Sequence, residues 1–233
     1  MEQLRHQFRE DLQGLEEQTL GGLDLVIQQL DRAREALAYQ DVELAGMVVA
    51  DDDRIDGRYL EVHQGILSLL ARQAPVATDL RLVAALLHVL RCIERMGDQC
   101  VNVAKLVPLS GFEAPKDKDI LDAIERMGLL AHSQVAEVKG AFAARDVELA
   151  RDLVRQDSEI NQLQRKIFRR AVEVGDNLEM REWAMFMVLV ARCLERIGDN
   201  TVDIAEQVVF VVTGLFREFA DASAPPPETA PAS

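Results

Sequence analysis

An internal repeat limits the possible folds of this chain more than any other feature of its sequence. Residues 91–107 read RCIERMGDQCVNVAKLV and residues 192–208 read RCLERIGDNTVDIAEQV, so nine of seventeen positions are identical at an offset of 101. The segment DVELA occurs at residues 41–45 and again at residues 146–150, at an offset of 105. The chain therefore contains two homologous halves, and the difference between the two offsets indicates a short insertion between the repeated segments.

Helical periodicity runs through both halves. Apolar or small residues recur in steps of four and three at positions 82, 86, 89, 93, 96, 100, 103 and 107, and the same seam returns 101 residues later. This spacing is typical of helices that pack in bundles. Only Pro75, Pro108 and Pro115 precede residue 225, so long helices are permitted. The breaks in the pattern predict six helices, at residues 3–38, 41–73, 77–107, 118–144, 147–174 and 178–219.

The simplest architecture for this pattern is all-α, with two antiparallel three-helix bundles side by side and related by a pseudo-twofold axis. The first bundle covers residues 1–108, a linker covers residues 109–116, and the second bundle covers residues 117–220. Four of the seven prolines fall in the final segment, residues 221–233. That segment has too little apolar content to pack, so we expect a disordered tail.

Composition narrows the class of protein. The formal net charge is −14 without any basic cluster, which repels nucleic acids and anionic lipid surfaces. The three cysteines, an odd number, lie in apolar helical patterns and are expected to be reduced core thiols. The chain shows neither an apolar signal segment nor 18 consecutive apolar residues. These features predict a cytoplasmic protein that does not bind nucleic acid directly.

The candidate chemistry lies in two pentads, Glu94-Arg95-Met96-Gly97-Asp98 and Glu195-Arg196-Ile197-Gly198-Asp199. Each places two carboxylates four residues apart, on one face of a helix. Relative to the apolar seam, the pentad carboxylates, with Asn102 and Asp203 one turn later, occupy positions that face away from the bundle interior. Each half should therefore present an acidic stripe outward, either as a solvated face with arginine partners or as a cation site.

A glycine in the middle of each pentad favours a cation site over a solvated face. Glycine costs about 1 kcal/mol relative to alanine inside a helix, so Gly97 and Gly198 suggest close approach of another helix or of a bound species. Sites made only of carboxylates suit hard cations, and bridging carboxylates can also hold iron or zinc clusters. The four histidines are scattered, without the Glu-x-x-His pairs of di-iron bundles. Because no catalytic constellation is recognisable either, we do not expect an enzyme.

The two pentads, the phrase QAPVATDLR at residues 73–81 and the halves of roughly 100 residues together resemble the PhoU family, over about residues 5–219. The resemblance implies a non-catalytic negative regulator of phosphate uptake and of the phosphate-starvation response. Such a protein acts as an adaptor between the ATPase subunit of the phosphate ABC transporter and a phosphate-sensing histidine kinase. It reaches the membrane only through these partners and is expected to be a homodimer.

The resemblance also implies multinuclear iron or zinc on the acidic motifs. Its best ligand positions here are Glu94, Asp98, Glu195 and Asp199, followed by Asp203, Asn102, Asp79, Asp52 and Asp157, with Arg95 and Arg196 as candidate partner contacts. Asp79 has no acidic counterpart in the second half, where Met180 stands. Three other functions remain open at this point: an accessory of a phosphate transporter outside the ABC class, a helical bundle that binds or stores metal, and a purely structural helical adaptor.

Overall fold

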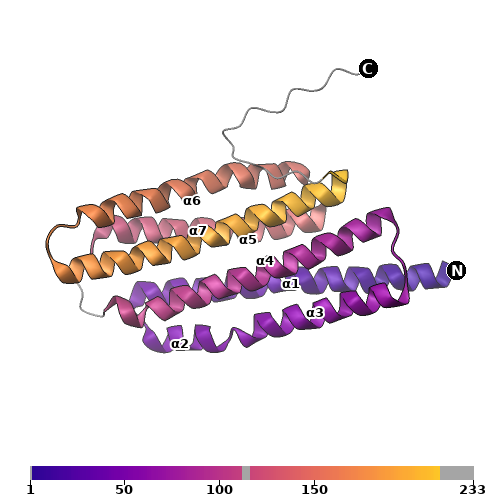
Figure 1. The fold of residues 1–233 in the computed structure, drawn as a ribbon, viewed down its shortest axis with the longest axis horizontal. Coiled ribbons are helices and arrows are strands. Elements are labelled where there is room, and N and C mark those ends of the chain that lie inside the picture. Colours follow the sequence, from indigo (N-terminus) through magenta and orange to yellow (C-terminus); the bar gives the residue numbers. More distant parts are fainter. Residues whose placement is uncertain (1, 112–115, 216–233) are drawn as a thin grey trace, which may run out of the picture.

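The computed structural model describes residues 2–111 and 116–215, and within those residues it contains helices and no strand (Figure 1). The elements in chain order are α1 (Glu2–Tyr39), α2 (Val42–Ala50), α3 (Asp53–Arg72), α4 (Ala77–Leu106), the short 3-10 helix η1 (Pro108–Ser110), α5 (Lys118–Ala144), α6 (Val147–Glu173) and α7 (Leu178–Thr213). None of these helices is long and apolar enough to cross a membrane. Residues 112–115 of the expected linker and the expected tail, residues 221–233, lie outside the described residues.

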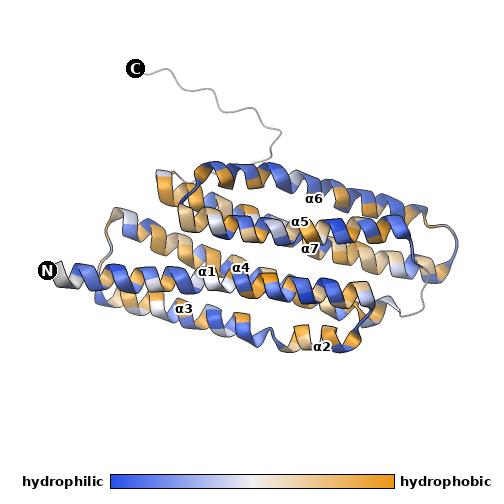
Figure 2. Ribbon diagram, turned by 180° about the vertical axis from the view of Figure 1, so that it is seen from behind, coloured by the Kyte–Doolittle hydropathy of each residue, from blue (hydrophilic) through white to orange (hydrophobic). Residues whose placement is uncertain are grey.

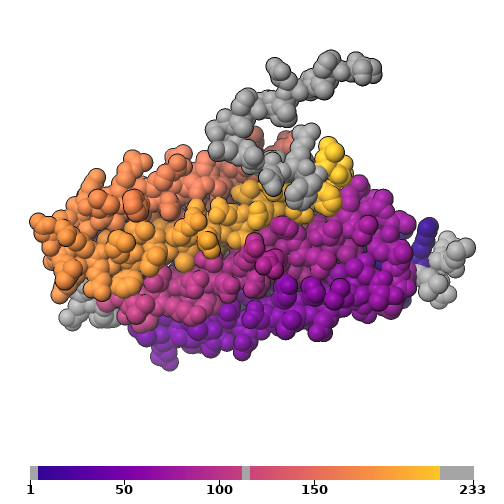
Figure 3. All heavy atoms as spheres, viewed as in Figure 1, coloured from indigo at the N-terminus to yellow at the C-terminus, as the bar shows by residue number. Residues whose placement is uncertain are grey.

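The helices form two bundles, so the predicted all-α architecture is confirmed. α1, α3 and α4 pack together with α2 in the first half, and α5, α6 and α7 pack together in the second. The halves meet mainly through α4 and α7, which run antiparallel, and secondarily through α1 and α5. In the space-filling view α4, in magenta, and α7, in orange to yellow, form adjacent stripes (Figure 3).

The predicted apolar seam forms the core of both bundles. In α7 all eight seam positions are buried, and Trp183 at the first of them is among the largest fully buried side chains. The seam of α4 is buried in the same way, with Leu82 half-buried at its start. Polar and apolar residues alternate along the helices, as expected where each helix buries one face (Figure 2). All three cysteines are buried free thiols.

Aspartate side chains begin the helices of corresponding position in the two halves. The carboxylate of Asp41 accepts a hydrogen bond from the backbone N–H of Leu44 at 2.9 Å, and that of Asp146 accepts one from Leu149 at 3.0 Å. These contacts satisfy N–H groups that have no partner within the helix. The repeated DVELA segment is thus an N-cap followed by the first turn of a helix.

The six-helix plan holds, but the second predicted helix, residues 41–73, is interrupted and forms α2 and α3. α2 ends at Ala50 and α3 begins at Asp53, whereas the corresponding α6 runs unbroken. The interruption falls at three consecutive aspartates, a residue type with poor helix propensity. Asp51 there pairs with Arg32 of α1, an interaction that holds the break against the bundle.

The final helix is shorter than predicted. α7 ends at Thr213, not at residue 219, because Gly214 adopts the left-handed conformation with φ of 72°. Its backbone N–H closes the last turn by donating to the carbonyl oxygen of Phe210 at 2.8 Å. A glycine in this conformation is a common end to a helix.

Ion pairs between α1 and α5 also join the halves. Nζ of Lys139 lies 2.6 Å from Oδ1 of Asp24, and Nη1 of Arg145 lies 2.7 Å from Oε1 of Glu16. About two turns beyond Asp24 along α1, Nδ1 of His132 lies 2.9 Å from Oδ1 of Asp31. The two bundles are therefore fixed by an apolar junction at α4 and α7 and by polar contacts at α1 and α5.

Candidate functional site

The pentad glycines let a neighbouring helix of the same bundle approach closely. A Cβ atom added to Gly97 would lie 2.9 Å from Cδ1 of Ile55 on α3. One added to Gly198 would lie 2.6 Å from Oδ1 of Asp157 on α6. Cβ atoms do not make contacts this short, so any larger residue at either place would force the neighbouring side chain to move. The close approach of a helix, which the mid-helix glycines suggested, is confirmed.

Because a neighbouring helix lies so close to each glycine, the acidic stripes are less exposed than predicted. Glu195 is only 9% exposed, and Glu94 is half-buried, while Asp98 and Asp199 are exposed. The expectation that all four carboxylates face away from the bundle was therefore wrong for the two glutamates. They lie where α4 meets α3 and where α7 meets α6, because the glycine one turn later brings those helices together.

In the second half, five polar residues from three helices meet at this place. We call this group the second-half cluster; it consists of Gln134 of α5, Asp157 and Asn161 of α6, and Glu195 and Asp199 of α7. Asp157 accepts a hydrogen bond on Oδ2 from Asn161 at 2.6 Å. Its Oδ1, and both polar atoms of the Gln134 side chain, are buried and have no hydrogen-bond partner. Such unpartnered buried atoms are rare in native proteins.

The carboxyl groups of the second-half cluster are hard to ionise. Burial raises the pKa of Asp157 to about 6, and the charges of Asp199 and Glu195 add to the rise. Burial also raises the pKa values of Glu195 and Asp199, while the neighbouring Arg192 opposes the rise in both. Carboxylates held together in this way attract a cation, which would relieve their mutual repulsion.

A corresponding first-half cluster consists of Gln29 of α1, Asp52 and Asp56 at the start of α3, and Glu94 and Asp98 of α4. Burial raises the pKa of Asp52, with the charges of Asp56 and Asp98 adding to the rise and a hydrogen bond from Gln29 opposing it. Burial and the charge of Asp98 likewise raise the pKa of Glu94. Oε1 of Gln29 is buried without a hydrogen-bond partner. The two halves therefore repeat one arrangement of an amide and several carboxylates.

Sequence reasoning missed four members of these clusters. Gln29 and Gln134 are 105 residues apart, as are Asp56 and Asn161 and the two predicted positions Asp52 and Asp157. The same offset relates the two DVELA segments, so extending that alignment along α1 and α5 would have found the glutamines.

The other predicted site residues lie elsewhere. Asp79 is in the first turn of α4, about 22 Å along the helix from Glu94, so it does not join either cluster. Asn102 is exposed on α4, and Asp203 is half-buried at the junction of α4 and α7. Arg95 and Arg196 are exposed. Arg192 donates hydrogen bonds to the Glu195 carboxylate.

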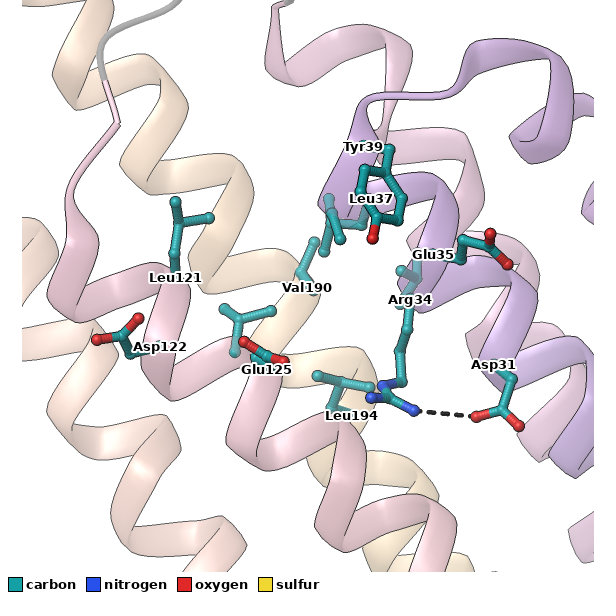
Figure 4. Close-up of a pocket in the computed structure, with 13 residues that line it drawn as sticks. Asp31, Arg34, Glu35, Leu37, Tyr39, Leu121, Asp122, Glu125, Val190 and Leu194 are labelled. Atoms are coloured by element: carbon teal, nitrogen blue, oxygen red, sulfur yellow. Dashed lines mark hydrogen bonds and ion pairs between the residues drawn. The ribbon is translucent and has the colours of Figure 1, made fainter.

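A cavity of about 660 Å³ lies at one end of the interface between the halves, lined by residues of α1, α4, α5 and α7 (Figure 4). Four carboxylates take part in its lining: Asp31, Glu35, Asp122 and Glu125. The one cationic side chain among the lining residues, Arg34, donates a hydrogen bond to Asp31 at 2.9 Å. The cavity is therefore negative and does not suit an anion such as free phosphate.

The chain resembles known proteins along most of its length. The PhoU domain matches residues 22–107 and 124–208. A phosphate-specific transport system accessory protein PhoU homolog of Deinococcus radiodurans is 32% identical over 218 residues, 91% of this chain and 99% of that protein. The homolog of Zymomonas mobilis is 32% identical over 210 residues, 89% of this chain and 87% of that protein.

Solved structures agree with this relationship. The crystal structure of PhoU from Pseudomonas aeruginosa matches with a TM-score of 0.84 at 27% identity, covering 89% of this chain and 100% of that one. The crystal structure of the phosphate transport system regulatory protein PhoU from Streptococcus pneumoniae also gives a TM-score of 0.84, at 26% identity over 91% of this chain and 99% of that one. The chain therefore belongs to the PhoU family, and its two halves each carry one PhoU domain.

Proposed function

We propose that this protein is a non-catalytic accessory of phosphate transport, which keeps phosphate uptake and the phosphate-starvation response low when phosphate is plentiful. One observation carries the proposal: a relative named as a phosphate-specific transport system accessory protein aligns with 91% of the chain. Both halves, with both acidic clusters, fall within the region of likeness.

In this proposal the protein acts in the cytoplasm as an adaptor between the ATPase subunit of a phosphate ABC transporter and a sensor histidine kinase. A surface with a net charge of −14 favours contact with basic patches on such partners. Arg95 and Arg196 are exposed beside the acidic clusters, where each can pair with a partner carboxylate. Phosphate status reaches the protein through its partners, because the acidic cavity repels the free anion.

The two clusters are the proposed sites of iron or zinc. Carboxylate and amide oxygens make up both donor sets, and the unpartnered oxygens of Asp157, Gln134 and Gln29 could take part in coordination. Within the residues that the structure describes, no three carboxylate oxygens of one cluster lie within 4.8 Å of one another. A bound metal would supply positive charge that fixes the spacing between α3 and α4 and between α6 and α7.

Deletion of the gene tests the regulatory role. We expect phosphate-starvation genes to become active in phosphate-rich medium, and the full-length chain expressed from a plasmid to switch them off again. If a clean deletion leaves these genes silent and phosphate uptake unchanged, the proposed role is wrong. Co-purification of a phosphate carrier without an ATPase subunit would instead place the protein with a transporter outside the ABC class.

Paired amide variants test the metal clusters. Glu94→Gln with Asp98→Asn, and Glu195→Gln with Asp199→Asn, keep the size of each side chain but remove its charge. Each pair should lower the iron or zinc measured by elemental analysis, and the two pairs together should abolish it, while the helical circular dichroism persists. Wild-type protein that neither carries nor takes up iron, zinc or manganese would contradict the metal assignment. The clusters would then act as contacts for basic partner residues.

We also expect a homodimer. Size-exclusion chromatography with light scattering on the full-length chain measures its mass directly, and a monomer over the micromolar range would contradict this expectation.

A further inference from the structure

Three side chains of different chemistry meet where α4 packs against α7. They are His88 and Cys92 of α4 and Asp203 of α7. One ligand atom from each lies within 4.8 Å of the ligand atoms of the other two. Within the part of the chain that the structure describes, this is the one group of three histidine, cysteine or acidic side chains gathered so closely.

The helical geometry explains why these residues meet. His88 and Cys92 are four residues apart and so share one face of α4. α7 runs antiparallel to α4 and brings Asp203 to the same face from the other half of the molecule. Cys92 is 1% exposed, Asp203 is half-buried and His88 is exposed. The group is thus buried at its sulfur end and open to solvent at its imidazole end.

We propose that His88, Cys92 and Asp203 form a zinc site that joins the two halves of the protein. An imidazole nitrogen, a thiolate sulfur and a carboxylate oxygen are the three kinds of ligand that Zn²⁺ takes in proteins, at about 2.0–2.3 Å. Ligand atoms of such a tetrahedral site lie about 3.4 Å apart, so atoms within 4.8 Å of one another need to move closer by about 1.4 Å at most. The fourth position of the tetrahedron would hold water, which the exposed side of His88 admits.

The pseudo-symmetry of the chain supplies an internal comparison. At an offset of 101 residues, the counterparts of His88 and Cys92 on α7 are Leu189 and Cys193, and the α4 counterpart of Asp203 is Asn102. The buried cysteine is therefore present at both places, but the histidine and the aspartate occur together at only one. Of the two related places in the α4–α7 junction, only the one with His88 and Asp203 has three zinc ligands.

This site differs in chemistry from the two acidic clusters, which contain only oxygen ligands. Zinc at His88, Cys92 and Asp203 would release the thiol proton to solvent and link α4 directly to α7. Its expected effect is therefore on the stability of the junction between the halves, whether or not the acidic clusters bind metal.

Cobalt titration of the full-length chain tests the proposal, because Co²⁺ replaces Zn²⁺ and reports on its ligands. After removal of metals with a chelator, added Co²⁺ should produce a thiolate-to-cobalt charge-transfer band in the near ultraviolet that saturates at one ion per chain. Added Zn²⁺ should abolish the band. Cobalt at the acidic clusters gives no such band, so the two kinds of site are read separately.

Variants that carry the residues of the pseudo-symmetric positions identify the ligands. His88→Leu and Asp203→Asn introduce the counterpart residues at accessible positions, so both should fold and each should weaken cobalt binding at least tenfold. Cys92→Ser should abolish the band, whereas the matched control Cys193→Ser should leave it unchanged. Leu189→His combined with Asn102→Asp should create a second site, with a second equivalent of the band. Cobalt binding without a thiolate band in the wild type, or unchanged binding in both His88→Leu and Asp203→Asn, would overturn the proposal.

Discussion

Replacement of Asp157 by asparagine should stabilise the metal-free protein. The pKa of this carboxyl rises from 3.8 to about 6, first through burial and then through the charges of Asp199 and Glu195. Each unit of pKa corresponds to about 1.4 kcal/mol, so the ionised side chain lowers the free energy of unfolding by up to about 3 kcal/mol near neutral pH. Asparagine keeps the size and removes the charge. We therefore expect the free energy of unfolding of Asp157→Asn to be about 2–3 kcal/mol higher than that of the wild type.

The pH dependence of this gain has a defined sign. Because the folded protein holds the Asp157 proton to higher pH than the unfolded chain, the wild type recovers stability as pH falls through about 6 towards 4. The advantage of Asp157→Asn should therefore be largest above about pH 7 and nearly vanish at about pH 4.

Urea unfolding of chelator-treated protein, followed by circular dichroism at several pH values, measures the difference. The exposed carboxylate Glu182 provides the control: Glu182→Gln should change the free energy of unfolding by less than about 0.5 kcal/mol at each pH. An Asp157→Asn protein that is less stable than the wild type near neutral pH, or whose advantage persists at low pH, would refute the reasoning. Added metal should reverse the order, because only the wild type keeps the full ligand set.

Three further tests concern the packing, a helix cap and the junction. Gly198→Ala should lower the free energy of unfolding by about 1–2 kcal/mol in urea, because its Cβ meets a carboxylate at 2.6 Å. Gly140→Ala, with open space around it, should instead raise that free energy by about 0.5–1 kcal/mol; equal effects would contradict the packing argument. Asp117 caps α5 and its pKa is lowered, chiefly by a hydrogen bond from an arginine. Asp117→Ala should therefore cost about 1–2 kcal/mol at neutral pH, and in urea titrations this loss should shrink, not grow, as pH falls below about 4. For Lys139 and Asp24, both about one-third to one-half exposed, a double-mutant cycle should give a coupling of about 0.5–1 kcal/mol that falls with added salt; a coupling insensitive to salt would exclude an ion pair.

The fold could be predicted because the repeat and the seam act over long stretches of chain. The shared phase of the seam in residues 82–107 and 183–208 placed α4 and α7 at equivalent positions, and both are buried along it as expected. The break between α2 and α3 could not be predicted in the same way, because no glycine or proline marks it. Three aspartates lower the local helix propensity there, and the pairing of Asp51 with Arg32 of another helix adds a tertiary contact.

The candidate site was predictable only where one helix carries it. Glu94 and Asp98, and their counterparts in the second half, share a face by helical spacing alone. The burial of Glu195 depends on how closely α6 approaches Gly198, and heptad position does not give that distance. The meeting of His88 and Asp203 depends on the axial register between two helices of different halves, and nothing in the local sequence specifies that register.

The antiparallel pairing of α4 with α7 also bears on how the molecule is synthesised and how it arose. Contacts within each half join residues close in the chain, so the first bundle can form while the second is still being translated. Until α7 emerges, the face of α4 around Cys92 has no cover. Its natural substitute would be α4 of another nascent chain, since two homologous helices that pack antiparallel reproduce the geometry of a twofold dimer. The junction in the finished protein therefore has the geometry of a twofold dimer interface, with both of its copies carried by a single chain.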